Sequence, residues 1–309
     1  MLSRFPQPSG CATLCRVSAV PYRFGAGQFP SEPAGLREAI RRYEELGFDF
    51  VATGDHVGGP APFALLTAAA AVSERLRLRT YVLNTSFWNP TLLARAAATL
   101  DRFSNGRLEL GLGAGTIKTE FDTAGIPWRP PSERIELMKA TLLKVRGLLD
   151  ADDHSPQPVQ TPVPTLIGAM SRGGLMVAAE HADIVGFAAL RHSDGHPPGT
   201  LRAATAEEAD EAVDTVRRAA GPRVFESDVL LQTVELGKDP LAGARAFLER
   251  EGEPDDPMTF AESPCALFAR TAADAAEELE RRRERWGFTS ITTFAASSDA
   301  LAAVARELR

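Results

Sequence analysis

The chain has 309 residues, of which 44% are hydrophobic and 24% are charged, as in an average globular protein. This composition excludes collagen-like, disordered and disulfide-scaffold classes. Acidic side chains outnumber basic ones by 41 to 34, which gives a net charge of −7 and argues against general nucleic-acid binding. No run of 18 apolar residues is present, so we expect no membrane span.

The three cysteines, Cys11, Cys15 and Cys265, are too few and too scattered for a disulfide framework. The pair Cys11 and Cys15 lacks the further Cys or His ligands of a zinc site, and we expect no metal. Residues 1–22 are interrupted by prolines and polar residues, which predicts a loose extension and no signal peptide. We therefore expect free thiols and a cytoplasmic protein.

Short apolar or β-branched runs alternate with longer segments of helical period. Eight runs are predicted to be strands: Arg23–Gly27, Phe48–Asp55, Leu76–Asn84, Arg107–Gly113, Thr165–Ala169, Asp183–Ala188, Ser227–Glu235 and Ser290–Ala295. Nine segments are predicted to be helices: Pro33–Leu46, Pro62–Glu74, Asn89–Phe103, Ser132–Leu149, Arg172–Ala182, Ala206–Ala219, Pro240–Glu251, Ala272–Trp286 and Asp299–Leu308.

Strands that alternate with helices of 10–15 residues are typical of a parallel sheet. Eight such units in residues 23–309 favour a single α/β domain, a closed (β/α)8 barrel, over an open doubly wound sheet. Two segments interrupt the alternation, Asp150–Pro164 and Arg191–Ala204, and both are predicted to lie at the barrel rim.

Chemistry in such barrels collects where the strands end, which directs attention to Asp55-His56 after the second strand. Histidine titrates near neutrality and can exchange a proton with a substrate, and an adjacent carboxylate can raise its basicity. The structural alternative is a loop pair that caps a helix or orders the turn. Position alone does not separate these two interpretations.

Two glycine-containing stretches follow later strands. Gly111-Leu112-Gly113-Ala114-Gly115 lacks the full dinucleotide-binding spacing, but its small residues would let a flat ring approach the backbone; the alternative is close packing at the rim. Ser171-Arg172-Gly173-Gly174 opens a helix directly after a strand, where amides, a hydroxyl and a guanidinium suit a phosphate. An ordinary serine cap with a surface arginine is the alternative.

Four stretches together resemble the luciferase-like monooxygenase superfamily, and within it the deazaflavin (coenzyme F420)-dependent oxidoreductases related to methylenetetrahydromethanopterin reductase. They are AIRRYEELGFDFVATGDH, LNTSFWNPTLLARAAATLDRFSNGRLELGLGAG, AAEHADIVGF and ELERRRERWGFTSITTF, and the resemblance covers residues 23–309. It implies a (β/α)8 barrel that holds a flavin or deazaflavin at its C-terminal face, and commonly a homodimer.

The resemblance also implies roles for individual residues. Asp55 and His56 match the acid and the histidine beside the ring, which are expected to be catalytic. The residues expected to bind the cofactor are Tyr81 and Val82, at the position of a non-prolyl cis peptide, Asn84, the ring-lining loop Gly113, Ala114, Gly115 and Thr116, and the phosphate loop Gly168, Ala169, Met170, Ser171, Arg172 and Gly173.

This chain departs from the family pattern at two of these places. Met170 and Ser171 interrupt a loop that is nearly all glycine in relatives, and Thr116 stands where relatives usually carry tryptophan or glutamate. Asp150–Pro164 is also shorter than the family insertion that helps to cover the site. Since the deazaflavin coenzyme is a polyanion and the chain carries −7, we expect a local arginine, first of all Arg172, to bind its phosphate.

Three functions follow in order of preference. The first is hydride transfer between F420 and a small organic substrate with a C=N, C=C or C=O bond, in which His56 exchanges the proton with the assistance of Asp55. The second is an FMN-dependent luciferase-like monooxygenase. The third is a barrel that has lost its cofactor and acts as a binding protein or a redox-free enzyme. The sequence does not identify the substrate.

Overall fold

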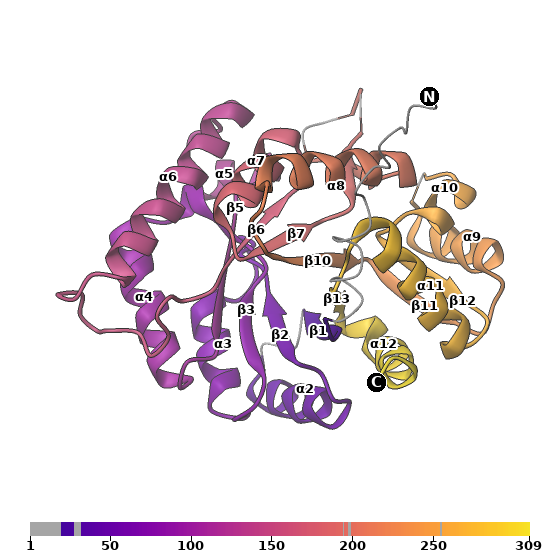
Figure 1. The fold of residues 1–309 in the computed structure, drawn as a ribbon, viewed down its shortest axis with the longest axis horizontal. Helices are drawn as coiled ribbons and strands as arrows, with labels where there is room; N and C mark the ends of the chain where they lie inside the picture. The colour runs from indigo at the N-terminus through magenta and orange to yellow at the C-terminus, as the bar shows by residue number, and fades with distance from the viewer. Residues whose placement is uncertain (1–19, 28–31, 194, 197–198, 254) are drawn as a thin grey trace, which may run out of the picture.

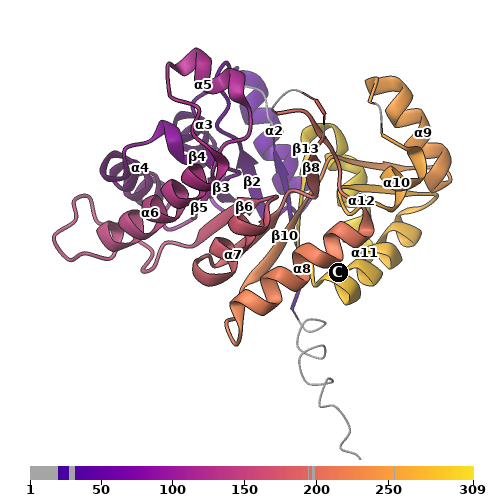
Figure 2. The same ribbon diagram turned by 90° about the horizontal axis from the view of Figure 1, so that it is seen from above.

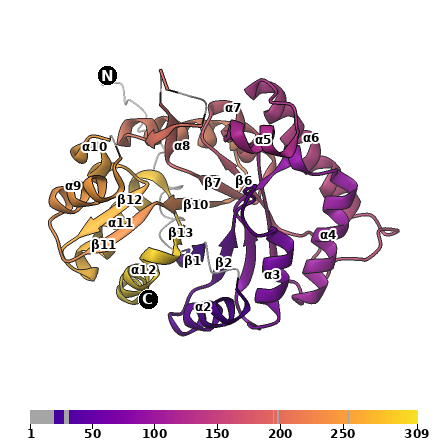
Figure 3. The ribbon, with the colours of Figure 1, turned by 180° about the vertical axis from the view of Figure 1, so that it is seen from behind.

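A computed structural model describes residues 20–309 except residues 28–31, 194, 197–198 and 254. Eight parallel strands close a barrel in the order β1 (Arg23–Gly27), β2 (Phe50–Thr53), β3 (Arg77–Thr80), β5 (Leu108–Gly113), β6 (Thr165–Ala169), β7 (Ile184–Phe187), β10 (Glu226–Leu231) and β13 (Ser290–Phe294), with β13 pairing back to β1. Figures 1 and 3 show these strands in the centre and the helices around them. The predicted (β/α)8 barrel is confirmed.

One helix follows each barrel strand on the outside. These helices are α2 (Pro33–Glu45), α3 (Pro62–Ala70), α4 (Pro90–Phe103), α6 (Pro131–Leu149), α7 (Arg172–His181), α8 (Ala206–Ala220), α11 (Ala272–Trp286) and α12 (Ser298–Glu307). Local capping chemistry sets several starts: the Asn89 side chain accepts from the amides of Thr91 and Leu92, and Thr205 forms a capping box with Glu208. Their apolar faces and the strands form one continuous core.

Two predicted strands are each divided in the structure. The third is broken at Tyr81-Val82, so that β4 (Leu83–Asn84) forms a separate short strand beside β5. The seventh is broken at Gln232, whose amide donates to the carbonyl of Cys265 over 2.6 Å. From there the chain leaves the barrel as β11 (Thr233–Leu236).

A small lobe follows this break. In it β11 pairs in parallel with β12 (Ala266–Ala269), and α9 (Pro240–Glu251) and α10 (Pro257–Glu262) pack beside them. Figure 3 shows the lobe on the side of the barrel away from α4 and α6. The helix at Pro240–Glu251 was predicted, but as part of the regular alternation, whereas β12 and α10 were not predicted. Cys265 is buried in the lobe as a free thiol, and Cys11 and Cys15 lie outside the described residues.

The two predicted rim segments lie at opposite ends of the barrel. Residues 150–164 follow a helix and contact the N-terminal strand ends, where the Gln160 side chain donates to the carbonyl of Leu108. This segment therefore does not cover the C-terminal face. A hairpin is formed by the antiparallel pair of β8 (Leu190–His192) and β9 (Leu201–Ala203) beyond the C-terminal end of β7, as expected for an insertion after a strand.

The predicted N-terminal extension lies outside the described residues up to position 19. Tyr22, which we assigned to the loose extension, is instead packed: it is buried, and its hydroxyl donates to the carbonyl of Leu279 in α11 over 2.8 Å. Across the part of the chain that the structure describes, every helix is too short or too polar to cross a lipid bilayer.

A charged cluster fills the barrel interior below the C-terminal face. Arg79 of β3 is fully buried; its guanidinium lies 2.7 Å from Glu109 of β5 and 2.6 Å from Asp228 of β10, and stacks 3.7 Å from the ring centre of Phe50. Burial alone raises the pKa of Glu109, but Arg79, Arg23 and Arg77 outweigh it and lower that pKa to about 2. The barrel therefore has an ion network at its centre in place of a purely apolar core.

Candidate active site at the C-terminal barrel mouth

Asp55 lies two residues after the end of β2. It is hydrogen-bonded to two residues that follow β3 in the chain. One of its oxygens, Oδ2, accepts from the indole nitrogen of Trp88 over 2.7 Å and from the amide of Asn84 over 3.3 Å. Burial raises the pKa of the Asp55 carboxyl, and the hydrogen bonds from Trp88 and Asn84 oppose that rise. Asp55 thus orders the turn after β4, and its interaction with His56 is electrostatic, without a hydrogen bond between the two side chains.

The hydrogen-bond partner of His56 is Glu120. His56 Nδ1 lies 2.8 Å from Glu120 Oε1, and the histidine side chain is 59% exposed whereas that of the glutamate is only 14% exposed. Glu120 comes from α5 (Lys118–Ala124), a helix after β5 that the sequence patterns did not predict. Figure 2 shows α5 at one end of the barrel, separate from the surrounding helix ring.

Tyr81 and Val82 are joined by a non-prolyl cis peptide bond, as the resemblance implied. The Val82 side chain lies against two backbone positions that have room only for glycine. A Cβ at Gly113 would come within 2.6 Å of Val82 Cγ2, and a Cβ at Gly168 within 2.9 Å of Val82 Cγ1. Three neighbouring strand ends therefore meet around one valine, in a floor with no room for additional side chains.

Asn84 supplies a polar group beside this floor. Its Oδ1 accepts from the amide of Ser86, whereas its Nδ2 is buried and has no hydrogen-bond partner among the described residues. Gly115 adopts φ +74°, and a Cβ there would lie 2.6 Å from that same Nδ2. A buried amide donor without a partner favours an additional acceptor, because an unsatisfied polar group costs about 1–3 kcal/mol.

The predicted ring-lining loop, residues 113–116, lies next to the hairpin. Ala114 and Thr116 are half-buried. A Cβ at Gly199, beside β9, would lie 3.4 Å from the Thr116 carbonyl oxygen. The hairpin thus extends from the end of β7 to the loop after β5. No tryptophan or glutamate side chain stands at position 116, but Glu120, one helical turn later, brings a carboxylate to the same end of the barrel.

The predicted phosphate loop joins β6 to α7. The Ser171 hydroxyl accepts from the amide of Gly174 over 3.3 Å, as an ordinary N-cap does. Met170 presents its carbonyl to the guanidinium of Arg191, which also donates to the Glu208 carbonyl over 3.0 Å. Arg172 is exposed and forms no ion pair with any residue in the described ranges. Both sequence-based interpretations therefore remain open for this loop: the serine caps the helix, while the arginine remains available.

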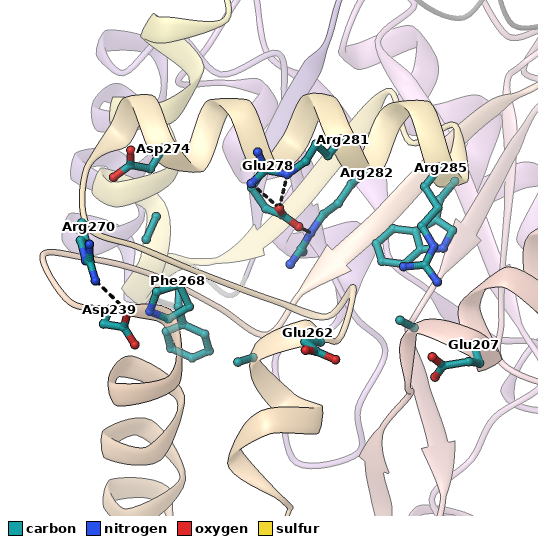
Figure 4. A pocket seen from close by; sticks show the side chains of 15 residues that line it. Glu207, Asp239, Glu262, Phe268, Arg270, Asp274, Glu278, Arg281, Arg282 and Arg285 are labelled. Atoms are coloured by element: carbon teal, nitrogen blue, oxygen red, sulfur yellow. Dashed lines mark hydrogen bonds and ion pairs between the residues drawn. The ribbon is translucent and has the colours of Figure 1, made fainter.

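A hollow lies away from the barrel mouth, between the lobe and α8 and α11. It has a volume of about 820 Å³, and Figure 4 shows the charged side chains that line it. Arg270 pairs with Asp239, and Arg281 and Arg282 both pair with Glu278. None of the predicted site residues lines this hollow, so it is not the candidate site.

Residues 17–228, more than half of the chain, match the family model described as luciferase-like monooxygenase. The chain belongs to this family. Its family membership agrees with the barrel, the cis peptide bond at Tyr81-Val82 and the glycine-walled floor at the strand ends.

Among curated relatives, the F420-dependent glucose-6-phosphate dehydrogenase of Amycolatopsis mediterranei (strain U-32) is 36% identical over 143 residues, 43% of this chain and 42% of the relative. The 5,10-methylenetetrahydromethanopterin reductase of Archaeoglobus fulgidus is 29% identical over 157 residues, 48% of this chain and 47% of the relative. The chain thus matches less than half the length of these relatives.

Among solved structures, an F420-dependent secondary alcohol dehydrogenase in complex with an F420-acetone adduct superimposes with a TM-score of 0.74. It is 18% identical in sequence, and the match covers 94% of this chain and 99% of that structure. At this identity the likeness shows a shared fold.

Sequence reasoning missed three residues of this region. Glu120 is hydrogen-bonded to His56, Trp88 donates a hydrogen bond to Asp55, and Arg191 donates one to the carbonyl of Met170 in the predicted phosphate loop. The available signal for Glu120 was an acidic residue shortly after a glycine-rich strand end, in a segment for which we predicted no helix. Trp88 was visible as the aromatic residue immediately before the Asn89 cap.

Proposed function

We propose that this protein is an F420-dependent oxidoreductase that transfers a hydride between the deazaflavin and a small organic substrate. The observation that carries the proposal is the conjunction, at one barrel mouth, of a titratable histidine with a carboxylate partner and a floor with room only for glycine. The similarity to F420-dependent relatives supports the choice of cofactor over other flat rings.

The residues present fit such a cofactor. A ring at the mouth has a floor in Val82 with Gly113 and Gly168, where any larger residue than glycine would clash. Asn84 Nδ2, buried and unpartnered among the described residues, offers a donor to a ring acceptor, and a side chain larger than glycine at position 115 would press against it. We assign Tyr81, Ala114 and Thr116 to the wall of the same site.

The phosphate end is assigned to the loop from Gly168 to Gly173. The free amides at the start of α7 and the exposed guanidinium of Arg172 suit an anion, although Ser171 is engaged as the cap. Arg191, in the β8 strand of the hairpin, donates a hydrogen bond to the Met170 carbonyl. The hairpin thereby holds the loop at Ala169, Met170 and Ser171, where relatives have glycine.

When bound, the deazaflavin supplies a ring carbon that donates or accepts a hydride. The protein's residues hold the reactants and move the proton. His56, exposed at the mouth, exchanges a proton with the substrate heteroatom, while Asp55 fixes Trp88 and the turn that carries Asn84. The hairpin of β8 and β9, which reaches Thr116, limits access of water to the mouth.

The deciding experiment is to titrate the purified protein separately with F420 and with FMN and to follow cofactor absorbance and fluorescence. F420 is expected to bind and FMN to bind weakly. Tight FMN binding without F420 binding would overturn the proposal. Absence of binding by either cofactor would also overturn it, in favour of a barrel without a cofactor, for which the departures at Met170 and Thr116 argue.

The second candidate is an FMN-dependent monooxygenase, which the description of the matching family model favours. Reduced flavin activates oxygen whereas deazaflavin does not do so usefully, because carbon replaces the ring nitrogen. Oxygen consumption in the presence of a flavin reductase distinguishes the two. The F420 proposal predicts no consumption above that of the reductase alone.

We also propose that the protein acts in the cytoplasm as a homodimer. An apolar groove of about 490 Å³ runs between α2 and α3 and includes Leu36, Leu65 and Val72, and the exposed Ala64 and Ala68 are small enough to allow close approach of a second copy. Light scattering should give twice the chain mass for the natural protein and a smaller mass for Ala64→Glu. A monomeric natural protein would contradict this assignment.

A further inference from the structure

The two ring nitrogens of His56 face different surroundings. Nδ1 lies 2.8 Å from Glu120 Oε1, on the side of α5. Nε2 lies on the opposite side, above the end of β2, where a Cβ built on Gly54 would be 3.2 Å from Nε2 and 3.4 Å from the carbonyl oxygen of Tyr81. The imidazole therefore lies between α5 and the strand ends at Gly54 and Tyr81.

We propose that Glu120 is a positioning residue for His56. Its carboxylate accepts a hydrogen bond from Nδ1–H, holds the neutral imidazole in that tautomer and leaves Nε2 unprotonated towards the barrel mouth. The inference about the tautomer stands on the geometry of the protein alone. What Nε2 then does for a substrate rests on the proposed function.

The position of Glu120 is fixed by packing on both sides of its helix. The next residue, Phe121, is fully buried; its ring centre lies 5.3 Å from that of Phe87 and 4.7 Å from that of Trp128. The guanidinium of Arg134 covers the Trp128 ring at 3.6 Å. These contacts pack α5 against Phe87, which follows β4, and against α6. Glu120 therefore reaches His56 from a helix that is held in place on the barrel.

No other described side chain competes for Glu120. Within the described ranges, His56 is its one hydrogen-bonded or ion-paired side chain. Asp55, the other carboxylate close to both residues, has its Oδ2 engaged by Trp88 and Asn84. Lys118 and Asp122 pair with each other on the exposed side of α5. Among the described side chains, the Glu120 carboxylate is thus hydrogen-bonded to His56 alone.

This arrangement gives the proton a defined path. A proton leaves a substrate O–H or N–H for Nε2, and the bonding electrons stay on the substrate heteroatom. The imidazolium that forms has both nitrogens protonated, and its positive charge faces the Glu120 carboxylate at hydrogen-bond distance. In the reverse direction the same proton returns from Nε2 to the heteroatom.

The test is the tautomer of His56 in the full chain without cofactor. Long-range proton–nitrogen correlation spectra of histidine-labelled protein are recorded at about pH 9, where an ordinary imidazole is neutral, and His56→Ala identifies the signal. The natural protein is expected to show Nδ1–H with unprotonated Nε2. Glu120→Gln keeps a carbonyl acceptor and should preserve this pattern, whereas Glu120→Ala should shift the population towards Nε2–H.

Asp122→Ala is the matched control, because it removes a carboxylate from the same helix without touching His56; it should leave the tautomer unchanged. The proposal is overturned if the natural protein already carries the proton on Nε2, or if Glu120→Ala leaves Nδ1–H in place. The first of these outcomes needs no variant and holds even if Glu120→Ala fails to fold. The readout contains no cofactor, so failure of F420 binding with the expected tautomer would count against the proposed function alone.

Discussion

Arg79 Nη1 and Asp228 Oδ2 lie 2.6 Å apart across the interior of the barrel, and both side chains are fully buried. Asp228 also accepts from the hydroxyls of Ser290 and Thr292 over 2.6 and 2.9 Å. β3, β10 and β13 are thus tied together below the candidate site. An ion pair removed so completely from water is retained only because its remaining hydrogen-bonding groups are also satisfied.

Replacement of Arg79 by methionine should destabilise the protein strongly. It leaves Glu109 and Asp228 buried without their shared cation, and the loss of one partner of such a pair costs about 3–5 kcal/mol. Urea unfolding followed by circular dichroism measures the change in free energy. Arg42→Ala, which breaks the exposed pair with Asp299, is the control and should cost less than about 1 kcal/mol. Equal effects of the two variants would refute a dominant role for burial.

Glu109 should make stability depend on pH in the acid range. Its pKa falls from 4.5 to about 2 in the folded protein, so its ionised form stabilises the fold fully above about pH 4.5 and loses this effect as the pH falls towards 2. The shift corresponds to about 3 kcal/mol. Unfolding free energies of the natural protein and Glu109→Gln should differ most near neutrality and converge as the pH is lowered from 5 to about 3. A difference that stays constant over this range would contradict the low pKa.

The glycines around Val82 should be replaceable only together with the valine. Gly113→Ala places a methyl group 2.6 Å from Val82 Cγ2 and should destabilise the protein by about 1–3 kcal/mol. In Gly113→Ala/Val82→Ala the clashing γ carbon is absent, so the double variant should recover part of that loss. Gly147→Ala in α6, with nothing within 4 Å of its Cβ position, is the control and should be neutral or stabilising. If the two substitutions change the free energy of unfolding additively, the methyl group at position 113 does not clash with the Val82 side chain.

The barrel itself was predictable because each unit carries its own signal. Asn89 followed by proline marks the start of α4, and runs such as Leu108–Gly113 are apolar at every position except Glu109 because a barrel strand is buried on both faces. The lobe was not predictable in this way. Ser227–Glu235 reads as one β-rich run, and only a tertiary hydrogen bond from the Gln232 amide to the Cys265 carbonyl marks the point where it leaves the barrel.

The location of the candidate site was predictable from the sequence, but the hydrogen-bond partners of its residues were not. The rule that chemistry gathers at strand ends located His56, Asp55 and the glycine stretches correctly at the C-terminal mouth. Adjacency in sequence suggested that Asp55 assists His56, and the two interact electrostatically, but the hydrogen bond to the ring comes from another residue. The partner of His56 comes from 64 residues further along the chain, and only the folded geometry brings Glu120 to it.

Arg172 should contribute to cofactor affinity if the phosphate lies at the start of α7. Arg172→Ala is expected to weaken F420 binding about tenfold, which corresponds to about 1.4 kcal/mol, a typical size for a partly exposed charge-assisted contact. Fluorescence titration at two salt concentrations measures it, and the loss should be smaller at high salt. Arg245→Ala, an exposed arginine on α9 in the lobe, should leave the affinity unchanged. Unaltered affinity in Arg172→Ala would place the phosphate elsewhere.

Asp55 and Trp88 should be energetically coupled, since the indole nitrogen donates to a carboxylate that burial has partly desolvated. Trp88→Phe keeps an aromatic ring against Phe63, 5.3 Å away between ring centres, and removes only the donor. A cycle of Asp55→Ala, Trp88→Phe and the double variant, followed by urea unfolding, should give a coupling of about 1.5–3 kcal/mol, as for hydrogen bonds to charged groups. Asp55→Ala should leave the tautomer of His56 unchanged, because Glu120 and not Asp55 accepts from its ring. A coupling near zero would show that the Asp55–Trp88 hydrogen bond does not contribute to stability, and a shifted tautomer would indicate that Asp55 acts on the histidine directly.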